Sequence, residues 1–184
     1  MKSERDIYRD LMLQIEGLLC GERDAIANAA NIAAVLFQEL PGLNWAGFYF
    51  LRENDELVLG PFQGKPACVR IASGRGVCGA AVARKAAVRV EDVYAFPDHI
   101  ACDAASRSEL VVPLMRGDNV FGVLDLDSPL VGRFDIGDEA GMRRVAEIFM
   151  ESSNPFCCTR RDCRLDAVLA ARLRGPSSGK EGAV

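Results

Sequence analysis

The sequence of 184 residues lacks a long apolar run, and its first residues, MKSERDIYRD, have no apolar signal region after their charges. A membrane-spanning helix needs roughly 20 apolar residues, so we expect no membrane association and a cytoplasmic location. Basic residues are also in deficit, since 22 lysines and arginines face 26 acidic residues and leave a net charge of −4. This balance argues against nucleic acid as the main partner.

Metal-binding motifs are scarce as well. The single histidine, His99, lies far from the tail cysteines Cys157, Cys158 and Cys163, and these cysteines contain no CxxC pair. A zinc site therefore has little support, and we expect no metal and no cofactor. Because cytoplasmic thiols are normally reduced, the seven cysteines favour catalysis, sensing or burial over a structural disulfide framework.

The length and the hydrophobic content of 49% suit one well-buried core. We predict one domain over residues 1–153 and a C-terminal extension over 154–184. In the extension, a short amphipathic helix is indicated by the spacing of Leu165, Val168, Leu169 and Leu173, and a disordered end follows.

The periodicity of apolar residues predicts helices over about 4–20, 23–39, 77–84 and 133–153. Alternating residues predict strands from 44 to a turn at 52–56 and over 57–60, 66–71 and 86–93, and a hairpin over 109–129. Loops are expected over 60–65 and 94–108. This order predicts an α+β fold, a mainly antiparallel sheet flanked by helices.

Three cysteines stand in short, turn-rich segments rather than in a periodic core pattern: Cys68 in PACVRI, Cys78 in GRGVCGAA and Cys102 in HIACDAAS. Cys78 falls in the first turn of the helix expected at 77–84, where free N–H groups favour an anion or a thiolate. Cys20, at the end of the first helix, is interpreted as a packing residue.

Acidic and aromatic side chains are placed to line a site beside these thiols. Asp125 and Asp127 share one face of their strand, and Glu109 begins the preceding strand. Trp45, Gly47 and Tyr49 also share a face, and a glycine between two aromatic residues leaves an open slot, unless both rings simply fill the core. Thiols beside acids indicate thiol redox chemistry on a small substrate.

The motifs NWAGFYFL, LGPFQGKPACVRI, GRGVCGAA, FPDHIACDAAS, SELVVPL and GVLDLDSP–RFD resemble the free methionine-(R)-sulfoxide reductases, which are stand-alone GAF-domain enzymes. The resemblance covers most of the chain through about residue 153. It is specific, because generic GAF domains lack this cysteine set and the LGPFQGKPAC block. The tail with its three cysteines has no counterpart in the family.

The resemblance implies a GAF-like fold and reduction of free L-methionine (R)-S-oxide, not of the oxidised residue in proteins, with recycling by thioredoxin. It implies that Cys102 is the attacking thiol, Cys68 the principal resolving thiol and Cys78 an auxiliary redox cysteine. The implied substrate pocket consists of Trp45, Tyr49, Glu109, Asp125 and Asp127. Relatives often form homodimers, so by analogy we expect the same here.

This chemistry suits the residues. A sulfoxide sulfur is a poor electrophile until its oxygen is protonated or strongly hydrogen-bonded, so the site needs a thiolate and an acid. Clustering the three carboxyl groups should raise the pKa of at least one. We hypothesise that Asp127 or Glu109 donates to the sulfoxide oxygen and that the other acids hold the substrate's ammonium group.

Two alternatives stay open at the level of sequence. The main rival function is a GAF sensor that binds a small ligand or responds to redox state without turnover. His99 could act as a general base for Cys102, although an ordering role in its loop is preferred. The tail cysteines could join a disulfide relay, but we expect truncation at about Ser153 to leave activity intact.

Overall fold

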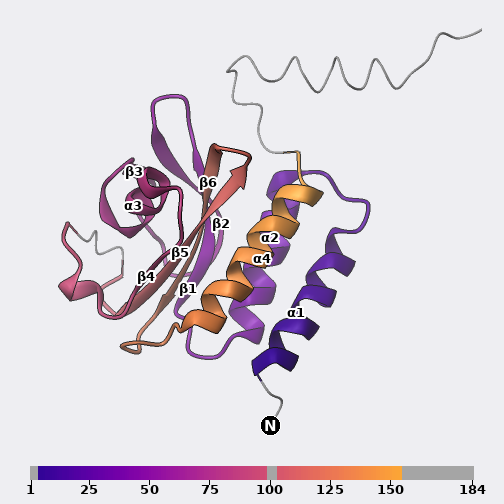
Figure 1. Ribbon diagram of the computed structural model, residues 1–184, viewed down its shortest axis with the longest axis horizontal. Helices are drawn as coiled ribbons and strands as arrows, with labels where there is room; N and C mark the ends of the chain where they lie inside the picture. The colour runs from indigo at the N-terminus through magenta and orange to yellow at the C-terminus, as the bar shows by residue number, and fades with distance from the viewer. Residues whose placement is uncertain (1–3, 99–102, 155–184) are drawn as a thin grey trace, which may run out of the picture.

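The computed structural model describes residues 4–98 and 103–154, and this part of the chain forms a six-stranded sheet with helices on both faces (Figure 1). The helices are α1 (Glu4–Leu19), α2 (Ala25–Glu39), α3 (Gly76–Arg84) and α4 (Ile136–Ser152), with a 3₁₀ turn at Val93–Ala95. The strands are β1 (Trp45–Leu51), β2 (Glu56–Gly64), β3 (Arg70–Ala72), β4 (Val88–Val90), β5 (Ser108–Arg116) and β6 (Asn119–Ser128). Within these ranges no helix has the length and apolar character to cross a membrane.

The strand order is β3-β2-β1-β6-β5-β4, and all neighbouring strands are antiparallel. Helices α2 and α4 pack on one face of the sheet with α1 outside them, whereas α3 lies on the opposite face (Figure 1). The α+β architecture and the mainly antiparallel sheet are therefore confirmed.

Capping residues set the starts of two helices. Asp24 accepts hydrogen bonds from the backbone N–H groups of Ile26 and Ala27 at the start of α2. Asp135 and Asp138 form a capping box at the start of α4. Such caps satisfy N–H groups that have no partner within the helix, and the four predicted helices agree with the structure to within a few residues.

The strand predicted over 57–60 is confirmed as part of β2, but the predictions of a loop at 60–65 and of a strand beginning at 66 are wrong. Residues 60–65 were expected to form a loop, but β2 continues to Gly64 and pairs with β1. The register shifts so that Gly60 and Pro61 lie opposite the single residue Phe48, which makes a β-bulge. Proline is tolerated at a bulge, so a segment with the composition of a loop stays in the sheet. The next strand begins only at Arg70, and Cys68 precedes it.

Of the two alternatives at Gly47, an open slot or aromatic rings that fill the core, the structure shows the second. A Cβ atom at this position would lie 2.4 Å from the Cβ of Phe62 and 2.6 Å from the ring of Trp45. The rings of Trp45 and Phe62 stack with their centroids 5.4 Å apart. Glycine is therefore needed for close packing, and the two rings fill the space beside it.

Other predictions have mixed outcomes. Cys20 is exposed rather than a packing residue. The predicted roles of His99, Cys102 and the tail cysteines fall on positions 99–102 and 155–184, which lie outside the described residues. The domain boundary at residue 153 and the homodimer stay predictions.

Candidate active site

The register of three neighbouring strands brings the predicted acids together. Glu109 on β5 pairs with Asp127 on β6, and Asp127 also pairs with Trp45 on β1. Asp125 lies two positions along on the same face of β6. Directly opposed residues in a sheet have Cβ atoms about 5 Å apart, so the strands place the carboxyl groups side by side.

A pocket lies on this face of the sheet, between the strands and α3. It is lined by all five residues of the predicted substrate pocket and by Cys78. The complete lining is Trp45, Tyr49, Lys65, Pro66, Ala67, Ile71, Arg75, Gly76, Val77, Cys78, Asp103, Ser106, Glu109, Asp125 and Asp127. Trp45 and Tyr49 stack at 5.8 Å between ring centroids and form an aromatic wall.

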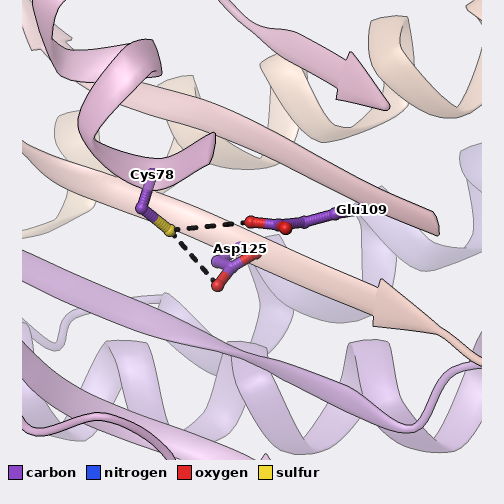
Figure 2. Close-up of side chains that lie close together, drawn as sticks. All are labelled: Cys78, Glu109 and Asp125. Carbon is purple, nitrogen blue, oxygen red and sulfur yellow. Dashed lines mark hydrogen bonds between the residues drawn. The ribbon is translucent and has the colours of Figure 1, made fainter. Parts of the chain in front are cut away.

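Helix α3 places the Cys78 thiol against two of the acids (Figure 2). The Sγ atom of Cys78 lies 3.3 Å from Oδ2 of Asp125 and 4.0 Å from Oε1 of Glu109. All three residues are buried. The thiol and the two carboxyl groups come from three different elements, α3, β5 and β6, and point toward one another in this view.

The prediction that clustering raises a carboxyl pKa is confirmed. Burial raises the pKa of Asp125 to about 7, although the hydrogen bond from Cys78 opposes the shift. Burial also raises the pKa of Glu109, as do the charges of Asp125 and Asp127. The pKa of Asp127 is raised by burial and by Asp125 and Asp103, and the hydrogen bond with Ser106 opposes this. The pocket therefore retains protons in neutral solution.

Of the two alternatives given for the start of α3, an anion or a thiolate, a thiolate at Cys78 is not what the structure indicates. Burial raises the pKa of this thiol well above its usual range, and the negative charges of Asp125 and Glu109 raise it further. The start of α3 does favour negative charge, but two buried acids beside the sulfur outweigh it. In this arrangement Cys78 is a protonated thiol that donates to Asp125.

Cys68 is half-buried in the segment between β2 and β3. Its backbone carbonyl accepts a hydrogen bond of 3.0 Å from the hydroxyl of Tyr49. The neighbouring residues Pro66 and Ala67 line the pocket, so Tyr49 ties the Cys68 segment to the pocket wall. Cys102, the predicted attacking thiol, lies outside the described residues, although the next residue, Asp103, lines the pocket.

Residue-level reasoning missed a polar rim around the pocket. The ammonium group of Lys65 lies 3.3 Å from Asp103, and the side-chain amide of Asn44 donates to both Asp103 and Ser106. The indole N–H of Trp45 donates to the backbone carbonyl of Lys65. Lys65 and Asp103 fall within the motifs LGPFQGKPAC and FPDHIACDAAS, which were the available signal for them. Arg75, before α3, also lines the pocket and was not singled out.

The fold and this pocket on one face of the sheet are those of a GAF domain. The family model described as "GAF domain" matches residues 24–151. The chain is 53% identical over 143 residues to the free methionine-R-sulfoxide reductase of Escherichia coli (strain K12), covering 78% of this chain and 86% of that protein. It is 38% identical over 157 residues to the free methionine-R-sulfoxide reductase of Saccharomyces cerevisiae, covering 82% and 87%.

A solved structure is similar over the same region. The free methionine-R-sulfoxide reductase of Neisseria meningitidis in complex with its substrate superposes with a TM-score of 0.80 at 46% identity, covering 83% of this chain and 91% of that one. The chain belongs to the free methionine-R-sulfoxide reductase family of GAF-domain enzymes.

Proposed function

We propose that this protein reduces free L-methionine (R)-S-oxide to L-methionine in the pocket between α3 and the sheet. Membership of the reductase family supports the reaction. The observation that carries the assignment of the site is the row formed by Trp45, Asp127 and Glu109 across three paired strands. This row combines an aromatic surface, which suits a methyl group bound to sulfur, with acids whose raised pKa values favour the protonated form.

The proposed reaction uses Cys102 as nucleophile. Its thiolate attacks the sulfoxide sulfur and forms an S–S bond, while a proton from a neighbouring acid lets the sulfoxide oxygen leave as hydroxide. Hydroxide then attacks the Cys102 sulfur, the S–S bond breaks, methionine leaves with both electrons of that bond, and Cys102 becomes a sulfenic acid. The Cys68 thiol then condenses with the sulfenic acid to form a disulfide and release water. A dithiol reductant, thioredoxin in our proposal, reduces this disulfide and restores both thiols.

The acids supply the proton that the first step requires. Glu109 or Asp127 donates a hydrogen bond to the sulfoxide oxygen, because burial and neighbouring charges raise the pKa of both groups and so favour the protonated form that can donate. Asp125 and the remaining acid hold the ammonium group of the substrate. Cys78, which donates to Asp125 at 3.3 Å, orients that carboxyl group and is the auxiliary thiol.

The same acids account for selectivity toward the free amino acid. A methionine sulfoxide residue inside a protein has an amide where the free molecule has an ammonium group, so it offers no cation to Asp125. The substrate carboxylate faces Arg75 and the first turn of α3, which has no side-chain cap. Positive charge and helix N–H groups both favour an anion at this end of the pocket.

The test is an epimer-resolved assay. Reduced protein is incubated with both epimers of free methionine sulfoxide and dithiothreitol or thioredoxin, and each epimer is quantified. We expect selective loss of the R epimer, no loss with Cys102→Ser, and wild-type loss with Cys20→Ser as the matched control at an exposed cysteine. N-acetylmethionine sulfoxide should be a poor substrate, because acetylation removes the ammonium group.

The outcomes separate the two candidate functions. If folded, fully reduced protein consumes neither epimer but binds methionine sulfoxide, the protein is a ligand-binding GAF sensor. If the N-acetyl compound is reduced as well as the free amino acid, the role of the acids in holding the ammonium group is wrong while the reductase activity stands.

A further inference from the structure

The side chains of Cys78, Glu109 and Asp125 bring three possible metal ligands together at the base of the pocket (Figure 2). The thiol sulfur and one oxygen of each carboxyl group all lie within 4.8 Å of one another. In a tetrahedral zinc site, Zn–S and Zn–O bonds of about 2.3 and 2.0 Å place sulfur and oxygen ligands roughly 3.5 Å apart. The observed separations from Cys78 Sγ, 3.3 Å to Asp125 and 4.0 Å to Glu109, fall on either side of that value. Small side-chain shifts would therefore complete the ligand geometry.

A second observation points to a ligand at this place. Asp125 is only 6% exposed, and its Oδ1 atom has no hydrogen-bond partner among the described residues. Buried carboxylate oxygens normally have a partner, because loss of hydration is otherwise uncompensated. Its other oxygen, Oδ2, already accepts from Cys78. A cation held beside Asp125 would supply what Oδ1 lacks.

The donor set selects the class of ion. Magnesium and calcium prefer oxygen ligands alone, whereas a thiolate together with carboxylates suits a borderline-soft divalent ion. We propose that Cys78, Glu109 and Asp125 of the reduced protein form a binding site for a single divalent ion of the zinc class. A fourth ligand position is left for water.

Binding converts the Cys78 thiol to a thiolate and releases its proton, together with any proton held by the two carboxyl groups. The two positive charges of the ion offset the repulsion between the negative charges of Cys78, Glu109 and Asp125. The ion would occupy the acids that hold the substrate's ammonium group, so it is an inhibitor and not a cofactor. This consequence rests on the proposed function, whereas the binding site itself does not.

The experiment is a titration of the full, reduced chain with Zn²⁺ by calorimetry and with Co²⁺ by absorption, in buffers of different ionisation enthalpy. We expect one ion per chain, release of protons, and a thiolate-to-cobalt band in the near ultraviolet. Asp125→Asn and Cys78→Ser should each weaken binding at least about tenfold, and Cys78→Ser should remove the thiolate band. Cys20→Ser is the matched control and should bind as the wild type does.

The variants also exclude the other cysteines as the source of binding. Binding that is unchanged in both Asp125→Asn and Cys78→Ser would overturn the proposal and assign the ion to cysteines elsewhere. If the wild-type protein binds no ion, the proposal is also wrong. Two independent variants keep the test valid if one of them fails to fold. Turnover measured with a chelator present tests the proposed function separately, because we expect it to proceed without any metal ion.

Discussion

The two faces of the central strands differ in chemistry although both are formed by alternate residues of the same strands. On β6, Leu124 and Leu126 face the helices and are fully buried in the apolar core. Asp125 and Asp127 alternate with them and line the pocket. The apolar face gains free energy from burial, whereas the pocket face holds acids whose charged forms are disfavoured by burial. Both faces carry buried apolar residues, but only the α3 side combines its apolar cluster with buried acids, whose charged forms destabilise the fold.

Strand β1 repeats this division. Ala46, Phe48 and Phe50 belong to the core under α2 and α4, and Trp45 and Tyr49 belong to the pocket side. The period of two in a strand separates these roles between adjacent residues. Substitutions one residue apart should therefore affect different properties, and the predictions below test this separation.

The largest loss of stability is expected on the helix side. Leu126→Ala removes a fully buried side chain and should lower the free energy of unfolding by about 2–5 kcal/mol, which urea denaturation would measure. Turnover per folded molecule should change little. Leu130→Ala, at a side chain that is 55% exposed, is the matched control and should cost under about 0.5 kcal/mol. Equal effects of the two substitutions would contradict the assignment of Leu126 to the core.

The pocket side should show the opposite pattern. Glu109→Gln and Asp127→Asn each remove an acid from the row across β5 and β6, and each should lower kcat/KM by roughly 10²-fold or more. The free energy of unfolding should not fall, because burial of a neutral amide costs less free energy than burial of a carboxylate. Asp118→Asn, in the exposed turn between β5 and β6, should have wild-type kinetics. Unchanged turnover in both pocket variants would show that neither acid serves the reaction.

Much of this division was predictable from sequence, because it depends on local alternation. The shared face of Asp125 and Asp127 follows from their spacing alone. The continuation of β2 through Gly60 and Pro61 was not predictable, since the bulge that accommodates them depends on pairing with β1. The protonated state of Cys78 was missed for a similar reason. Its acidic neighbours lie 31 and 47 residues away in sequence, whereas the helix start that favours a thiolate is local.

The family resemblance supplied what local patterns could not, and the comparisons confirm both the family and the GAF fold. The structure brings together the predicted pocket residues and Cys78. The disulfide partners, recycling by thioredoxin and the cytoplasmic location stay predictions. The pairing of Cys102 with Cys68 in particular depends on a residue outside those that the structure describes.

The last prediction is opposite in sign, a gain of stability from a pocket substitution. Burial raises the pKa of Asp125 from 3.8 to about 7, so between these values the folded protein binds more protons than the unfolded chain. The contribution of Asp125 to the free energy of unfolding is fully present below about pH 4 and is lost as the pH rises through about 7. Asn cannot ionise and can still accept from Cys78. Asp125→Asn should therefore unfold at a higher temperature than the wild type at about pH 8, by roughly 2–4 °C for each 1 kcal/mol regained.

This prediction concerns the difference in unfolding temperature between Asp125→Asn and the wild type at each pH, and not the pH dependence of either protein alone. Surface acids such as Asp92, whose pKa is lowered by a hydrogen bond from Arg107, change the stability of the protein in the opposite direction. Their stabilising contribution is lost as the pH falls, and it is the same in both proteins. Thermal unfolding with a chelator present, from about pH 5 to 8, should show the advantage of Asp125→Asn growing with pH, while Asp118→Asn follows the wild type. An advantage that is constant across this range would mean that packing, and not the burial of a charge, explains the gain. In that case the burial of ionisable acids would not distinguish the pocket face of the sheet from the helix face.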